Sequence, residues 1–158
     1  GMWKPVPMGD VQSTNISKGH DAKDYIYHSE ATGFKYLGDC ISGTKYDAAH
    51  KEQGDGWRMP TIEELEELLK RCEWEWTKEN GIYGVRFKAR NGNNIFFPAI
   101  EMETPGKYDW CYWSGTCNTE KDDESWVIGF SNSDDITNLE VGSQDKWACL
   151  PIRAVRDK

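Results

Sequence analysis

The sequence lacks the features that mark membrane spans and most metal sites. No apolar run approaches the roughly 20 residues that a transmembrane helix needs, and no secretory signal peptide is visible. Cys-x-x-Cys does not occur, and the three histidines, His20, His28 and His50, show no metal-ligand spacing. We therefore expect no membrane span and no structural zinc site.

The familiar signatures of catalysis are also missing. The chain has no Gly-x-Ser-x-Gly, phosphate-binding loop, dinucleotide fingerprint or His-Glu-x-x-His. Paired acids occur only where a helix face or a polar turn is expected, without the apolar surroundings that tune a general acid. The residues themselves therefore favour a binding protein over an enzyme.

Basic residues are fewer than acidic ones: 19 Lys and Arg against 27 Asp and Glu give a net charge of -8. Such a surface repels a phosphate backbone, which excludes nucleic acid as an expected partner. The 158 residues fit one domain that can bury a core without metal or disulfide support, and we expect a monomer. Aromatic residues are abundant at 13%, with eight Trp and seven Tyr, so large rings must fill the core and some reach the surface.

Residues 1–24 lack periodicity and predict an extended N-terminal arm, and residues 25–158 are expected to form a single domain. Short strand-like runs follow at 25–27 and 34–37. A first helix is predicted from Lys45 to Gln53, with Thr44 as its N-cap and Gly54 ending it. His50 is then a half-buried helix residue.

The second helix has the clearest local pattern. Pro60 ends an extended segment, Thr61 can cap the helix, and Glu64 stands three residues on as its reciprocal partner. A core-facing stripe follows at helical spacing, and it consists of Leu65, Leu68, Leu69 and Cys72. Before the helix, Trp57 is expected to pack and Arg58 to pair with a carboxylate or a backbone carbonyl.

After this helix the pattern changes to the alternation of strands. Residues 74–76 alternate, and residues 83–89 and 95–97 flank Asn91-Gly92 as the two strands of a hairpin. Residues 101–119 look loop-rich, and strand-like segments return at 126–130, 136–141 and 150–155. Helices followed by antiparallel strands predict an α+β fold.

Several stretches, taken in order, resemble one known family. They are Asp47-Ala48-Ala49, Gly56 to Thr61 with Glu64, Leu68-Leu69, Cys72 to Trp76, Asn80-Gly81, Asn91 to Ala99, Tyr112-Trp113-Ser114 and Pro151 to Val155. These blocks look like those of the Fibrobacter succinogenes major paralogous domain, across about residues 45–157. The resemblance implies a C-type-lectin-like fold, with two helices followed by antiparallel hairpins. It also implies a bacterial protein located extracellularly, on the outer-membrane surface or in the periplasm.

The block from Trp57 to Thr61 is also similar to one in formylglycine-generating, sulfatase-modifying enzymes, which share the lectin-like scaffold. Those enzymes bind copper through a cysteine pair, and two close thiolates, Cys111 and Cys117, could hold such a soft metal here. Alternatively, these two cysteines form a small-loop disulfide, or either pairs with Cys40 or Cys149. A structural role is the favoured interpretation.

Animal C-type lectins bind calcium and sugar through Glu-Pro-Asn or Gln-Pro-Asp and Trp-Asn-Asp, none of which is present. Asn132, Asp134, Asp135 and Asn138 could hold calcium through oxygens, although a polar turn explains them as well. No resident cofactor is therefore expected.

The ring-rich region between residues 104 and 147 suggests where a ligand binds. Trp113 is expected to be buried, and Trp110, Tyr112 and Trp147 are predicted to be exposed ligand-binding rings, because aromatic faces anchor sugars and proteins. The sequence thus favours a non-enzymatic recognition domain that binds glycan or protein. The alternatives are an oxidase that uses the cysteine pair and a structural module of a surface assembly.

Overall fold

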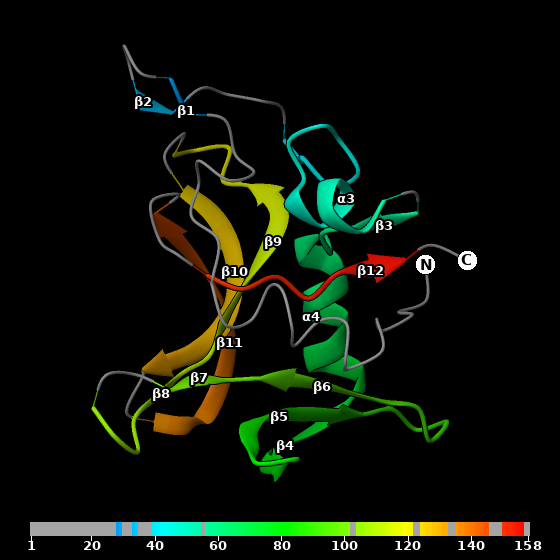
Figure 1. The fold of residues 1–158 in the computed structure, drawn as a ribbon, viewed down its shortest axis with the longest axis vertical. Coiled ribbons are helices and arrows are strands. Elements are labelled where there is room, and N and C mark those ends of the chain that lie inside the picture. The colour runs from blue at the N-terminus through cyan, green and yellow to red at the C-terminus, as the bar shows by residue number, and fades with distance from the viewer. Residues whose placement is uncertain are drawn as a thin grey trace.

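The protein is described by a computed structural model over residues 28–29, 33–34, 39–54, 56–101, 104–121, 124–132, 135–145 and 150–156. This part of the chain contains two helices and antiparallel strands, so the predicted α+β class is confirmed (Figure 1). The predicted arm at 1–24 and the strand-like residues 25–27 and 35–37 lie outside it. The elements are β1 (His28–Ser29), β2 (Gly33–Phe34), α3 (Ala48–Gln53), β3 (Trp57–Arg58), α4 (Ile62–Arg71), β4 (Glu73–Glu79), β5 (Ile82–Lys88), β6 (Asn94–Pro98), β7 (Ile100–Glu101), β8 (Tyr108–Asp109), β9 (Cys111–Cys117), β10 (Glu124–Asn132), β11 (Asp135–Asp145) and β12 (Val155–Arg156).

Helix α4 forms as its sequence predicts. Thr61 and Glu64 make a reciprocal capping box, in which each side chain accepts a hydrogen bond from the other's backbone N–H. Leu65 and Leu68 are buried, and the helix ends at Cys72, whose backbone is extended. Neither helix in the described residues is long and apolar enough to cross a membrane.

Helix α3 starts later than predicted, at Ala48 instead of Lys45. The N-cap is Asp47, not Thr44, because the Asp47 carboxylate accepts hydrogen bonds from the backbone of Ala49 and His50. Gly54 ends the helix with a φ of 83°, as expected. His50 is half-buried, which the sequence also predicted.

Strands β4, β5 and β6 form a three-stranded antiparallel sheet. A two-residue turn joins β4 to β5, with both Asn80 (φ 49°) and Gly81 (φ 81°) in the left-handed region, which suits a tight hairpin. The predicted hairpin of β5 and β6 is confirmed, and Gly92 supplies its positive φ of 86°. This sheet lies below α4 in Figure 1.

The second three-stranded sheet has the order β11-β10-β9, and it overturns one prediction. Residues 111–117 were expected in a loop, yet they form strand β9, which pairs with β10. The other edge of β9 also receives partners, because Ile41 N donates to Gly115 O and Trp113 N donates to Pro151 O. Partners that are distant in sequence thus make a strand where local composition suggested a loop.

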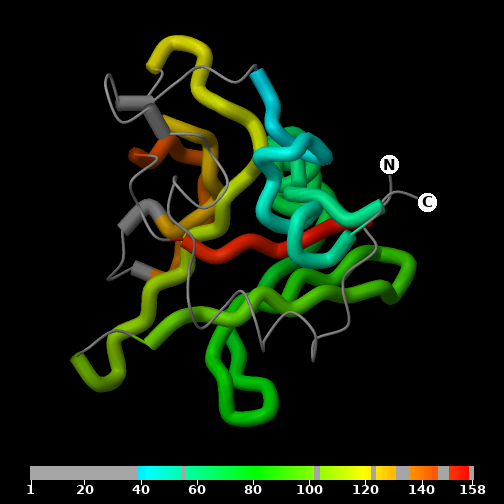
Figure 2. The backbone as a smooth tube through the Cα atoms, turned by 45° about the horizontal axis from the view of Figure 1, so that its top comes forward, coloured from blue at the N-terminus to red at the C-terminus, as the bar shows by residue number. Residues whose placement is uncertain are grey.

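The C-terminal segment 150–156 crosses the molecule between the elements around α3 and β3 on one side and β6 on the other (Figures 1 and 2). Only Val155 and Arg156 form a ladder, with β3, although the predicted strand covered 150–155. Two clusters of buried apolar residues form the interior. The first contains Met59, Trp113, Ile152 and Ala154 among others, and the second contains Leu65, Phe87, Phe97, Trp110 and Tyr112 among others.

Candidate functional site

The prediction that Trp110 and Tyr112 are exposed ligand-binding rings is wrong. Their exposed fractions are 2% and 0%, and both lie in the second core cluster. Trp110 Nε1 donates a hydrogen bond to Phe97 O at 2.7 Å, and Tyr112 Oη donates one to Pro98 O at 2.5 Å. Because both polar groups find partners inside, the rings can be buried at little cost. Trp113 is fully buried, as expected, and Trp147 lies outside the described residues.

Half-exposed rings gather instead at the rim of the second core cluster. We call this set the aromatic cluster, and it consists of Trp74, Trp76, Tyr83, Tyr108 and Phe130. Trp76 and Tyr83 stack with their centroids 5.8 Å apart and their planes 8° from parallel. Tyr108 lies 5.8 Å from Trp76 and 5.0 Å from Tyr83, so three part-exposed rings adjoin one another.

The aromatic cluster is assembled from elements distant in sequence. Trp74 and Trp76 alternate along β4 and therefore share a face, and Tyr83 lies on β5 beyond the Asn80-Gly81 turn. β8 contributes Tyr108, and β10 contributes Phe130, whose ring is 5.9 Å from that of Trp76. In Figure 1 these strands meet in the lower part of the molecule.

Polar groups adjoin these rings. The ammonium group of Lys78 lies 5.2 Å from the centroid of the Tyr83 ring, and Glu101 pairs with Tyr108 in the β7–β8 ladder. Among the large hydrophobic side chains that the structure describes, only Ile136 is exposed, at 40%. The described surface thus offers rings with charged neighbours rather than a broad aliphatic patch.

Sequence reasoning missed Trp76 and Tyr83 as candidate site residues. The alternation of Trp74-Glu75-Trp76 correctly indicates a strand, whereas the density of rings in 104–147 predicts the binding site elsewhere. The available signal was the spacing itself, because alternate tryptophans just before a tight Asn-Gly turn place their rings on one face of a hairpin.

The prediction of a disulfide or soft-metal pair at Cys111 and Cys117 is also wrong. Both residues lie on β9, where Cys111 pairs with Gly129 and Cys117 with Ser125, four residues apart on β10, so their Cα atoms are roughly 13 Å apart. A disulfide needs Cα atoms within about 7 Å, and one metal ion cannot join thiolates so far apart. Cys40, Cys72, Cys111 and Cys117 form no disulfide, and Cys149 lies outside the described residues. The hypothesis of an oxidase that uses Cys111 and Cys117 as a metal-binding pair is therefore not supported.

Cys111 is also poorly suited to act as a nucleophile. Burial, and secondarily the negative charge of Asp109, raise its thiol pKa to about 12. Since the thiolate is the reactive form, Cys111 stays protonated and unreactive near neutral pH.

Metal ligands do not converge within the described ranges, where no group of three or more His, Cys, Asp or Glu side chains could hold an ion. Of the candidate calcium ligands, Asn132 at the end of β10 pairs through its backbone with Asp135 at the start of β11. Asp134 lies outside the described residues, and Asn138 is exposed on β11.

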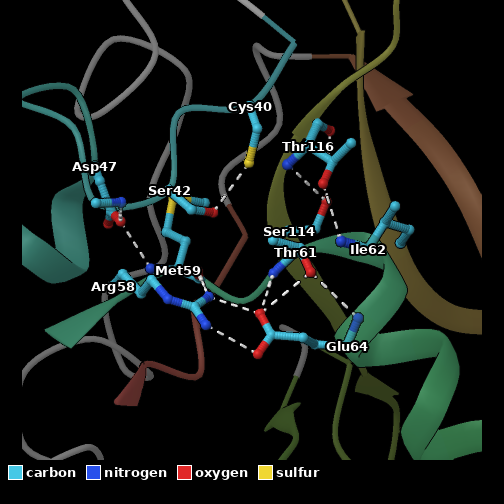
Figure 3. Close-up of polar contacts among 11 residues, drawn as sticks. Cys40, Ser42, Asp47, Arg58, Met59, Thr61, Ile62, Glu64, Ser114 and Thr116 are labelled. Carbon is cyan, nitrogen blue, oxygen red and sulfur yellow. Dashed lines mark hydrogen bonds and ion pairs between the residues drawn. The ribbon is translucent and has the colours of Figure 1, made fainter. Parts of the chain in front are cut away.

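The segment from Trp57 to Thr61 forms a hydrogen-bonded framework (Figure 3). Arg58 donates to both Glu64 carboxylate oxygens, at 2.6 and 3.0 Å, and to Met59 O at 3.2 Å, as the sequence predicted. Buried Asp47 accepts from Met59 N at 2.8 Å and so ties the segment to the start of α3. Burial would raise the Glu64 pKa, but hydrogen bonds from Arg58 and Thr61 outweigh it and hold that pKa below its usual value. The polar groups of this segment therefore hydrogen-bond to one another and hold α3, β3 and α4 together.

Comparison with known proteins finds no matching family model, no matching curated protein and no matching solved structure.

Proposed function

We propose that this chain is a non-enzymatic recognition domain that binds a carbohydrate through the aromatic cluster. The observation that carries the proposal is the adjoining, part-exposed rings of Trp76, Tyr83 and Tyr108. Ring faces left partly open can stack on the apolar face of a sugar, and nearby charged groups can hydrogen-bond its hydroxyls. Lys78 and Glu101 are placed to supply such bonds.

A carbohydrate fits the described surface better than a folded protein does. A stable protein interface buries about 800 Å² on each partner around an apolar, aromatic centre. The aromatic cluster is a rim of half-buried rings, and the single exposed large hydrophobic side chain that the described ranges contain, Ile136, lies on β11. A small stacking ligand needs no larger apolar area.

The finer assignment of the fold is part of the same proposal. The order of two helices followed by antiparallel hairpins, together with the sequence blocks quoted above, supports a C-type-lectin-like fold of the Fibrobacter succinogenes major paralogous domain type. On this assignment the protein is exported or attached to the bacterial surface, where a glycan ligand would be met.

The test is binding of the full chain to a glycan array, followed by titration of the best ligand. We expect Trp76→Ala and Tyr108→Ala each to weaken affinity at least tenfold, which corresponds to about 1.4 kcal/mol. Tyr46→Ala is the matched control, because Tyr46 is a half-buried ring packed against the other core cluster. If no glycan binds, or if all three variants bind equally well, the proposal fails.

Because Trp76 also packs against the core, each variant is checked for a native unfolding transition. Trp76→Phe provides a milder change that keeps a ring on the same strand. Its affinity is expected to fall between those of the wild type and Trp76→Ala.

A further inference from the structure

Arg153 places a guanidinium group inside the protein without the partners that such a group requires. Its exposed fraction is 1%, and neither Nε nor Nη1 has a hydrogen-bond partner in the part of the chain that the structure describes. Buried polar groups in folded proteins are nearly always hydrogen-bonded, and a buried charge without a counter-charge is strongly destabilising. The described residues therefore leave two donor groups of the Arg153 guanidinium without an acceptor.

The contact that the structure gives the Arg153 side chain is with an aromatic ring. Arg153 lies over the ring of Phe97, with its guanidinium carbon 5.9 Å from the ring centroid. The carbonyl of Phe97 accepts from Trp110, and the carbonyl of Pro98 accepts from Tyr112. A cation–π contact offsets part of the lost hydration but offers no acceptor to the N–H groups.

A neighbouring positive charge worsens the imbalance. Arg86 carries a second guanidinium close enough to repel that of Arg153, and Arg86 is itself held by Glu79 and Asn94. Burial lowers the pKa of Arg153 to about 10; Tyr112 opposes this shift and Arg86 adds to it, so Arg153 is still cationic at pH 7. The interior thus holds a positive charge that no described carboxylate neutralises.

We propose that Arg153 is the anchor of a carboxylate-binding site between the two core clusters. Ile152 and Ala154 on either side of Arg153 pack into the first cluster, whereas its guanidinium contacts Phe97 of the second. A planar carboxylate matches the donor geometry of guanidinium and supplies the missing negative charge. This site is separate from the aromatic cluster and does not depend on the proposed carbohydrate.

The carboxylate has two possible sources, which experiment can separate. One is a small soluble acid, such as acetate or a uronic acid. The other is an acidic side chain in the first 38 residues of the chain, which contain Asp10, Asp21, Asp24 and Glu30. Both sources use the same recognition chemistry at Arg153.

The first arm measures urea unfolding of the full chain in acetate or glucuronate against chloride at equal ionic strength. A soluble source predicts a midpoint that rises with carboxylate concentration, since a ligand bound to the folded state stabilises it. In Arg153→Met the apparent affinity should fall at least tenfold. Arg90→Met is the matched control, because Arg90 is exposed in the β5–β6 turn, and it should keep the full effect.

The second arm neutralises the chain's own acids with Asp10→Asn, Asp21→Asn, Asp24→Asn and Glu30→Gln combined. If one of them is the partner, this variant lowers the unfolding midpoint in the wild-type background but not in the Arg153→Met background. Arg153→Lys keeps the charge without the planar donor set, and it replaces Arg153→Met in both arms if the latter does not fold. The proposal is overturned if neither arm shows an effect that depends on Arg153.

Discussion

Gly84, in the middle of β5, lies so close to β6 that there is no room for a side chain at this position. A Cβ atom there would lie 2.7 Å from Phe96 Cζ and 2.8 Å from Pro98 Cα, with the Phe97 carbonyl oxygen closer still. Two of these three atoms belong to the backbone of β6, which pairs with β5 and cannot easily move away. The close approach of the two strands therefore requires glycine at this position.

We expect Gly84→Ala to destabilise the protein by about 3 kcal/mol, since overpacking against fixed backbone is relieved only by separating the strands. Urea unfolding of the purified variant measures the change. Gly142→Ala serves as control, because the nearest atom to its Cβ would be Val127 Cγ2 at 4.0 Å, an ordinary contact. Equal stability of the two variants would contradict the close approach of β5 and β6 at Gly84.

At the scale of a single element, α4 depends on charged contacts at its first turn. Glu64 caps the helix and pairs with Arg58 while remaining only part-exposed, so the ion pair is shielded from solvent more than a surface pair is. Loss of the charge should weaken the cap and the link to β3 together.

Glu64→Gln is therefore expected to lower the free energy of unfolding by about 2 kcal/mol at pH 7. The folded-state pKa of Glu64 lies below its unfolded value of about 4.3. The stabilisation is thus fully present above that unfolded value and is lost as pH falls through the folded pKa. Unfolding measured from pH 7 down to pH 3 should show the stabilities of wild type and variant converging at the acidic end.

Glu63→Gln removes the same charge one residue earlier in the helix, where the side chain is exposed. Its effect should stay below about 0.5 kcal/mol at every pH. A pH-independent gap between wild type and Glu64→Gln would show that the charge of Glu64 is not what stabilises the helix start.

At the scale of the whole molecule, the fold separates the cysteines and gives them different reactivity. Cys40 is exposed, Cys117 is buried, and the raised pKa keeps Cys111 protonated. We expect iodoacetamide at pH 7.5 to modify Cys40 in the native protein, with Cys111 and Cys117 modified only after unfolding.

Peptide mass spectrometry of the alkylated protein reads each site separately. A Cys40→Ser variant is the control, since it should lose the modification at position 40 and leave Cys111 and Cys117 unmodified until the protein unfolds. Detection of a disulfide between Cys111 and Cys117 in the native protein would contradict their placement at distant positions of β9.

Local features were predictable where a few neighbouring residues determine the structure. The α4 cap, the Gly54 stop and the β5–β6 hairpin each depend on side chains within a few positions of one another, and each is confirmed. The start of α3 was misplaced because Thr44 and Asp47 are both good caps. The Asp47 carboxylate also binds the backbone of Met59, twelve residues away, and that contact is not visible in local sequence.

By itself, the sequence determined the α+β class, the entry into α4 and the β5–β6 hairpin turn, because these follow from short-range hydrogen bonding and alternation. Only the tertiary structure decided which rings are exposed. Pairing of β9 with β10 buries Trp110 and Tyr112, whereas Trp76 and Tyr83 remain at the rim. The burial of Arg153 and the separation of Cys111 from Cys117 likewise arise from strand pairing and packing between residues far apart in the chain.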